Sequence, residues 1–392
     1  MKKYVEVIQN YLKENKESLI KLSHQIHQNP ETSNKEYFAC EVLTNFLKEA
    51  EFDVEINIAG HETGFIAKKK SSKGGAKIGL LAEYDALEGL GHGCGHNIIG
   101  VTSCGAAIAL SKVIEDVGGE VIVFGTPAEE GGDNGGAKVS FINEGVFDGV
   151  DVCMMIHPSN KTSITVESLA FHGIDFEFFG KPAHAAASPE AGINALDAMI
   201  LFYNGINALR QQVTPDVRIH GIITNGGEAP NIIPDYTKAR FYIRANKIKN
   251  CDSVAERVIK VAEGAAISTG CTFKHTYYEH SLEDMIVYPY FNQIFLDIAT
   301  DMGIEMDKSE KGKGSTDTGN VSHIMPTIHP YLKICDENIV GHTEEFKQAA
   351  ISKDGDKALL EGAEILAKIG LELLTDDEKL QKVKKEFEEI NK

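Results

Sequence analysis

Cysteine, histidine and glutamate side chains gather where the predicted strands of this sequence end. The apolar segment 77–82 predicts a strand, and the glycine-rich segment 91–97 that follows it contains Cys94 and His96. A thiolate and an imidazole at this spacing can bind one or two cations, because glycine permits the tight turns that bring them together. The pair could also have no joint role, or could form a cysteine nucleophile with a histidine base. Spacing alone leaves these alternatives open.

Two further strand ends carry residues of the same kind. Glu129 and Glu130 follow a predicted strand at 120–126, and His157 ends a predicted strand at 151–156. An acidic pair is often a solvated turn, and a histidine at a strand end is often a hydrogen-bonded core residue. One carboxylate of such a pair can instead bind metal while its neighbour accepts a proton from water. Because parallel α/β sheets form sites beyond the carboxyl ends of their strands, the three ends together predict a metal site.

The wider pattern predicts a mainly parallel sheet with helices on both faces, because strands and helices alternate along the first half of the chain. Helical spacing is found at 3–28, 36–50, 97–116 and 136–143, and strand-like runs at 53–58, 64–68, 77–82, 120–126 and 151–156. Two charged helices are expected over 348–392, with a break near Thr375.

From about residue 170 the order changes to strand, helix, strand, strand, helix, strand, which is typical of a ferredoxin-like α+β domain. Strands are expected at 174–178, 217–224, 237–245 and 271–279, and helices at 191–212 and 252–268. The run 174–178 alternates apolar and polar residues, as a half-exposed strand does. We therefore predict a discontinuous α/β catalytic domain (1–169 and 284–392) with an inserted domain at 170–283.

Composition excludes several classes of function. The chain has 392 residues with 39 Lys and Arg against 58 Asp and Glu, a net charge of −19, so binding to nucleic acid or to an anionic membrane is not expected. Seven scattered cysteines indicate reduced thiols. No apolar run approaches the roughly 18–20 residues of a membrane span, and the first residues do not resemble a signal peptide. These features predict a cytoplasmic protein.

Six short motifs together resemble metallopeptidase family 20. In chain order they are His27-Gln-Asn-Pro-Glu31, Asp85-Ala-Leu, Gly93-Cys-Gly-His-Asn97, Gly125-Thr-Pro-Ala-Glu-Glu130, Gly180-Lys-Pro-Ala-His184 and Asn231-Ile-Ile-Pro234. The Cys-Gly-His motif resembles the amidohydrolase branch of the family. Asn97, where most of that branch has Asp, resembles the group of the aminobenzoyl-glutamate hydrolase B subunit and peptidase M20-domain protein 2. The resemblance extends from about residue 20 to residue 346.

The resemblance implies two divalent metal ions per subunit, zinc or manganese, with cobalt and nickel also compatible with such ligands. It implies that one ligand is shared by both ions and that four more complete the site; these are Cys94, followed by His96, Glu130, His157 and His342. Glu129 would be the general base. His329 is an alternative to His342 in the last position.

Asp85 is expected to orient a metal-bound imidazole, since such rings usually donate their other N–H group to an acceptor. Many branches of the family have a histidine ligand where this chain has Glu83, so the role of Glu83 stays open.

For the inserted domain, the resemblance implies a lid that also forms a homodimer. His184 would reach the site of the partner subunit and hydrogen-bond the developing oxyanion. The positions that would hold the substrate are Asn231, Arg244, Ser315 and Thr316. The expected reaction is hydrolysis of the amide bond of an N-acyl amino acid or small dipeptide. The alternatives are a cysteine-dependent amidohydrolase that uses Cys94 and a non-catalytic relative that binds a small ligand or a partner.

Overall fold

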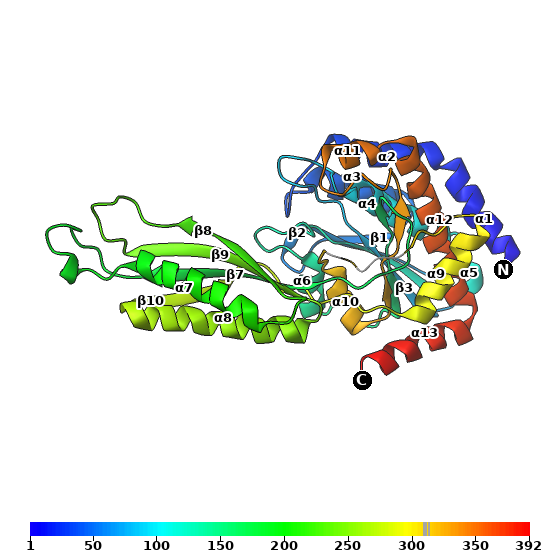
Figure 1. Ribbon diagram of the computed structural model, residues 1–392. Coiled ribbons are helices and arrows are strands. Elements are labelled where there is room, and N and C mark those ends of the chain that lie inside the picture. Colours follow the sequence, from blue (N-terminus) through cyan, green and yellow to red (C-terminus); the bar gives the residue numbers. More distant parts are fainter. Residues whose placement is uncertain (309–311, 313) are drawn as a thin grey trace. The chain divides into compact units, whose positions relative to one another are not determined.

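The computed structural model describes residues 1–308, 312 and 314–392. Its elements, many of which are labelled in Figure 1, form two compact units. The first unit comprises Met1–Glu167, Met285–Gly312 and Asp317–Lys392, and the second comprises Ser168–Asp284 and Lys313–Thr316. In this division Ser315 and Thr316 belong to the second unit, whereas the sequence analysis placed them in the first.

The first unit contains a mixed sheet with the strand order β1-β2-β4-β3-β5-β11. The strands are β1 (Asp53–Ile58), β2 (His61–Lys70), β3 (Lys77–Ala82), β4 (Glu120–Gly125), β5 (Val152–Met154) and β11 (Thr327–Ile328). β4, β3, β5 and β11 run parallel, whereas β1 pairs antiparallel with β2, and β2 with β4. The predicted strand 151–156 is shorter in the structure, where β5 ends at Met154. A separate strand, β6 (His157–Ser159), follows it and pairs in parallel with β12 (Tyr331–Lys333).

Helices cover both faces of this sheet, which confirms the predicted fold class (Figure 1). One face packs on the longer helices α1 (Lys2–Glu14), α2 (Lys16–Gln28), α3 (Tyr37–Glu49), α4 (His96–Ser111), α9 (Pro289–Asp301), α12 (Lys353–Thr375) and α13 (Asp377–Ile390), and on the short α5 (Ile114–Val117) and α11 (Glu344–Ala349). The other face packs on α6 (Ala137–Asn143) and α10 (Thr318–Ile324). Successive strand residues face opposite sides of the sheet: Leu80 packs with the apolar residues on the face covered by the longer helices, and Leu81 with those on the face covered by α6 and α10.

The prediction of one helix over 3–28 is wrong, because the chain forms α1 and α2 with a break at Asn15. The amide Nδ2 of Asn15 donates a hydrogen bond to the carbonyl of Tyr11 at 2.8 Å. Such local side-chain bonds compete with regular helix geometry. The predicted helix 97–116 likewise ends at Ser111 and is followed by α5.

α4 is buried along its whole length. It begins at His96, so the helix that anchors the centre of the first unit also fixes the histidine of the Cys-Gly-His motif. In the described part of the chain, no helix combines the length and the apolar character needed to cross a lipid bilayer.

The second unit has the predicted ferredoxin-like order. It contains β7 (Ala170–Phe179), the short η1 (Pro189–Ala191), α7 (Ala195–Leu209), the short η2 (Arg210–Gln212), β8 (Arg218–Asn225), β9 (Tyr236–Ala245), α8 (Ile248–Thr269) and β10 (Thr272–Tyr277). The strands pair antiparallel in the order β10-β7-β9-β8, and one apolar cluster joins the sheet to α7 and α8. This topology confirms the split βαβ arrangement.

One detail of this sheet differs from the prediction, because β7 is almost entirely buried rather than half-exposed. Asp175 is only 4% exposed. Its carboxylate accepts a hydrogen bond from Nε of Arg240 at 2.7 Å and pairs with Lys238 at 2.8 Å. Cross-strand cations from β9 therefore let a carboxylate occupy a covered position that periodicity assigns to solvent.

Candidate metal centre

The five residues predicted to bind metal come together in the first unit as two overlapping groups. Cys94, His96 and His157 form one group, and Cys94, Glu130 and His342 form the other. Within each group, one ligand atom from each residue lies within 4.8 Å of the others. The Sγ atom of Cys94 is 3.6 Å from Nε2 of His157, and Oε1 of Glu130 is 3.5 Å from Nε2 of His342. The shared member is the cysteine, as the family resemblance implies.

A turn at Gly95 places Cys94 beside the start of β6. Gly95 has φ +80°, a left-handed conformation that glycine adopts without strain, and it precedes the first residue of α4. A Cβ atom at Gly95 would lie 2.6 Å from Cγ of Pro158. The close approach of this loop to Pro158 therefore requires glycine, and it brings Cys94 next to His157.

His342 is fixed by its backbone. Its N–H donates to the carbonyl of Gly93 at 2.9 Å, and its φ of 65° lies in the left-handed region. The side chain of His342 is 56% exposed, and its ring faces Glu130. His329 instead packs its buried ring against His157, with centroids 5.4 Å apart, and belongs to neither ligand group of the described residues. The geometry therefore supports His342 over His329.

Two buried polar atoms show that this arrangement suits a cation. Nε2 of His96 and Oε1 of Glu130 are buried without a hydrogen-bond partner among the described residues. The other ring nitrogen of His96, Nδ1, lies 2.9 Å from a carboxylate oxygen of Asp85. That contact places the proton on Nδ1 and leaves a lone pair on Nε2. Because buried polar atoms are rarely left unpaired, these residues fit a divalent metal.

The pKa values of the adjacent carboxyl groups of Glu129 and Glu130 are shifted in opposite directions. Burial, with the nearby charges of Glu83 and Glu130, raises the pKa of Glu129 well above its ordinary value. Burial opposes the ionisation of Glu130 as well, but the nearby imidazoles of His342 and His96 lower its pKa. An environment that separates two carboxylates in this way suits one of them to carry a proton and the other to bind a cation.

Asn97 shows why an amide can replace the aspartate common in this branch. Its Nδ2 donates to Oγ of Ser23 at 2.9 Å and lies 3.4 Å from the carbonyl of Ala350. A carboxylate has no proton to donate and would face that carbonyl oxygen unfavourably.

The second unit presents two of its predicted site residues on exposed loops. Nδ1 of His184 accepts hydrogen bonds from the backbone N–H groups of Ala186 and Ala187 at 3.3 and 3.2 Å. Nε2 therefore carries the ring proton and can donate it. The backbone carbonyl of Asn231 accepts a hydrogen bond from Ala185 at 3.1 Å, so the loops of His184 and Asn231 lie side by side.

Arg244 and Ser315 also lie together in this unit. Nη1 of Arg244 donates to Oγ of Ser315 at 3.0 Å, and the guanidinium lies 5.0 Å from the ring centroid of Phe171. Ser315 and Thr316 are partly buried. The cation is thus held in place by a hydroxyl and a ring, which suits it to bind a carboxylate.

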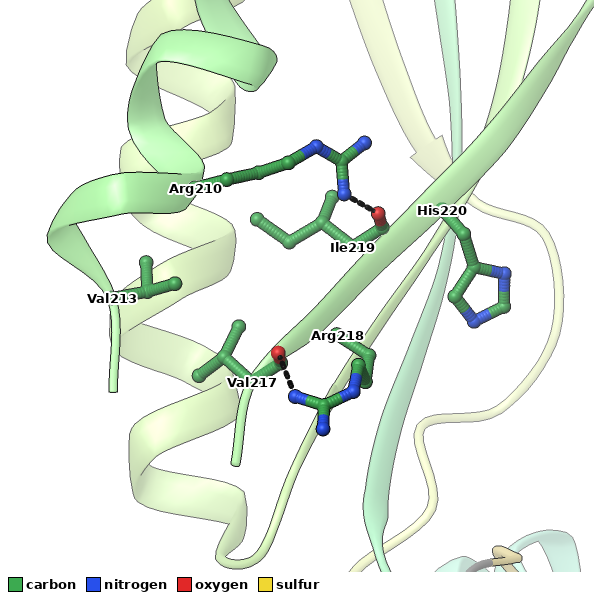
Figure 2. Close-up of a pocket in the computed structure, with 6 residues that line it drawn as sticks. All are labelled: Arg210, Val213, Val217, Arg218, Ile219 and His220. Atoms are coloured by element: carbon green, nitrogen blue, oxygen red, sulfur yellow. Dashed lines mark hydrogen bonds between the residues drawn. The ribbon is translucent and has the colours of Figure 1, made fainter. Parts of the chain in front are cut away.

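A cavity of about 290 Å³ lies between η2 and β8 (Figure 2). The guanidinium of Arg210 donates to the carbonyl of Ile219, and that of Arg218 donates to the carbonyl of Val217 at 2.8 Å. Both cations are bonded to the backbone of their own unit, and no predicted site residue lines the cavity.

Comparison with known proteins identifies the family. Residues 168–269 match the peptidase dimerisation domain of M20 proteins. The human Xaa-Arg dipeptidase is 34% identical over 391 residues, covering 95% of this chain and 89% of its own length. The chain belongs to the M20 peptidase family. The predicted resemblance to metallopeptidase family 20 is therefore confirmed.

Other M20 relatives agree with this assignment. The B subunit of the p-aminobenzoyl-glutamate hydrolase of Escherichia coli is 35% identical over 293 residues, 69% of this chain and 60% of that protein. A dinuclear metal-binding M20 peptidase from Bacillus subtilis has the same fold, with a TM-score of 0.66, 20% identity, and coverage of 92% of this chain and 99% of its own. This M20 protein is an amide-bond hydrolase of the peptidase type. Its two groups around Cys94 have the residue types that can bind divalent metal.

The M20 site includes a buried lysine that the sequence analysis missed. Nζ of Lys138 donates to Glu83 at 2.6 Å and to Asp317, and all three side chains are fully buried or nearly so. Two further groups of close ligand atoms include the proposed base: one is His96, Glu129 and Glu130, and the other is Glu83, Glu129 and Asp317. Burial opposes the ionisation of Glu83, but Lys138 and the nearby imidazoles lower its pKa to about 2. The lysine therefore supplies the positive charge for these carboxylates.

Proposed function

We propose that this M20 protein hydrolyses the amide bond of small dipeptides or N-acyl amino acids at the two groups that share Cys94. The observation that carries the proposal is the position of Glu129. One of its carboxylate oxygens lies 3.9 Å from Nε2 of His96, which has no hydrogen-bond partner among the described residues, and the pKa of Glu129 is raised. A buried carboxylate with a raised affinity for protons thus lies beside a set of cation ligands.

Each residue of the site has its own role in the proposed reaction. Bound divalent ions would lower the pKa of a water molecule and polarise the substrate carbonyl. Glu129 accepts the proton of the attacking water and returns it to the leaving amine. The ions would be held by Cys94, His96, Glu130, His157 and His342. Asp85 keeps the proton of His96 on Nδ1. A thiolate with imidazoles and a carboxylate suits zinc, and manganese, cobalt and nickel are also compatible.

The substrate we favour is a dipeptide with a basic C-terminal residue. The human and mouse relatives, at 34% and 36% identity, are Xaa-Arg dipeptidases. A net charge of −19 attracts cationic substrates to this chain. Arg244, held by Ser315, would bind the C-terminal carboxylate, with Asn231 and Thr316 as further contacts.

His184 would complete the site of a partner subunit in a homodimer. Its proton on Nε2 is available to hydrogen-bond an oxyanion, and its loop lies in the unit that matches the peptidase dimerisation domain. A donor of this kind stabilises the negative charge that develops on the carbonyl oxygen.

A cysteine-dependent amidohydrolase is the second candidate, because Sγ of Cys94 lies 3.6 Å from a ring nitrogen of His157. Burial raises the pKa of the Cys94 thiol, whereas an unaided nucleophile needs a lowered one. Treatment with EDTA separates the candidates: it should abolish activity of the metal enzyme, whereas a thiol enzyme should survive EDTA and be labelled at Cys94 by a reactive substrate analogue.

The proposed function is tested by hydrolysis assays on the purified protein. Dipeptides ending in Arg, Lys, Glu or Leu, N-acetyl amino acids and aminobenzoyl-glutamate should be assayed with zinc and manganese in parallel. We expect metal-dependent cleavage with preference for the basic dipeptides. Cleavage that needs no metal, or no cleavage in any combination, would contradict the proposal.

A further inference from the structure

The residue before the proposed base has an unusual backbone conformation. Ala128 has φ 60°, in the left-handed region that residues with a Cβ atom adopt at a cost, and it is fully buried. Such a conformation persists where the surroundings hold the backbone in place. The backbone contacts of Ala128 therefore bear on where Glu129 points.

The N–H group of Ala128 donates to a buried carboxylate from another part of the chain. Oε1 of Glu36 accepts this hydrogen bond at 3.1 Å and a second one from the N–H group of Asn34 at 2.9 Å. Oε2 of Glu36 accepts a hydrogen bond from Oγ1 of Thr63 at 2.7 Å. The side chain of Glu36 is fully buried, so three bonds fix its position.

A second carboxylate holds the residue on the other side of the base. The N–H group of Glu130 donates to Oδ2 of Asp85 at 2.9 Å. The N–H groups of the residues before and after Glu129 thus donate hydrogen bonds to two different buried carboxylates. Glu36 lies just before α3, and Asp85 lies after β3. Two anchors that flank one residue restrain the position of its Cα atom and the direction of its Cα–Cβ bond, from which the side chain starts.

We infer that Glu36 is a positioning residue for Glu129, acting through the N–H group of Ala128. The inference rests on the proposed role of Glu129 as the base. Among the described residues, Glu36 belongs to none of the cation groups. Its loss should therefore misplace the base while the metal ligands keep their ions, and a displaced catalytic group commonly costs up to about 10²-fold in rate.

The test compares Glu36→Leu, Glu36→Gln and Thr63→Val in the full-length protein. We expect Glu36→Leu to lower kcat by about 10–10²-fold with little change in KM and with unchanged metal content by elemental analysis. Hydrogen exchange of the peptide that contains Ala128 should become faster. In Glu36→Gln the amide oxygen still accepts both N–H groups, so kcat and exchange should stay near those of the wild type.

Thr63→Val is the matched control, because it removes a hydrogen bond to the other oxygen of Glu36 and leaves the bond from Ala128 intact. Normal kcat in Glu36→Leu, or an equal loss in Thr63→Val, would overturn the inference, as would loss of metal together with activity. If Glu36→Leu does not fold, the double variant Glu36→Leu/Ala128→Gly replaces it, since glycine adopts the left-handed turn without strain. Full activity of Glu129→Gln in the same assay would instead refute the proposed base.

Discussion

The two units of this M20 protein hold some of their functional side chains in different ways. In the first unit, Asp85 and Lys138 are buried and bonded to other charged or polar side chains. In the second unit, His184 and Asn231 stand on exposed loops and are held through backbone groups. The first arrangement is organised before any substrate arrives, whereas the second offers a donor that needs an opposing surface to act on. Substitutions in the two units should therefore differ in whether they affect stability or turnover.

The largest effect is expected at the proposed base. Glu129→Gln keeps the shape of the side chain but cannot accept a proton, so kcat should fall by roughly 10³–10⁴-fold. Metal content by elemental analysis should stay at the wild-type level, since Glu130 and the other ligands remain. Near-normal turnover in a metal-replete sample would show that another group is the base.

Loss of Lys138 should affect stability first. Lys138→Met leaves the carboxylates of Glu83 and Asp317 buried without their cation, which should lower the free energy of unfolding by about 3–5 kcal/mol. Urea denaturation measures the change. Lys382→Met is the control, because that lysine pairs with Glu378 on the surface, where ion pairs contribute little. Equal results for the two variants would show that Lys138 does not stabilise the carboxylates.

The exposed histidine should affect turnover without affecting metal binding or stability. His184→Ala should lower kcat by about 10²–10³-fold, the usual effect of removing one oxyanion donor. The His184→Ala variant can also be mixed with the inactive Glu129→Gln variant. If His184 acts in the partner subunit, each mixed dimer has one site with both Glu129 and His184, and activity is partly restored. Absence of any recovery, when mixed dimers are shown to form, would mean that His184 does not act across subunits.

A buried carboxylate of the first unit should also make stability depend on pH. Burial and the charge of Asp85 raise the pKa of Glu36 from 4.5 to about 7. The stabilising contribution of the protonated form is complete below pH 4.5 and is lost as the pH rises through 7. A rise of this size corresponds to ~3 kcal/mol.

Glu36→Gln does not titrate, so its stability relative to the wild type should be greater at pH 8 than at pH 5. Urea denaturation of the EDTA-treated proteins at both values measures the difference without a contribution from metal binding. The same stability difference at both pH values would show that Glu36 does not titrate in this range.

Periodicity and motif spacing predicted much of the architecture and the gathering of the ligand residues. The split βαβ order of the second unit follows from the alternation of its segments, and the meeting of Cys94 with Glu130 and His157 follows from their places at strand ends. The break at Asn15 was missed because one side-chain hydrogen bond leaves no mark on hydrophobic spacing. Lys138 and Asp317 are far apart in the sequence, and nothing local indicates that either charge is buried.

Anomalous diffraction from crystals loaded with zinc tests the central claim most directly, because it locates each ion. We expect two ions that both lie about 2.3 Å from Sγ of Cys94, one bound by His96 and His157 and the other by Glu130 and His342. Ions that do not contact Cys94, or a single ion among Glu83, Glu129 and Asp317, would contradict the account.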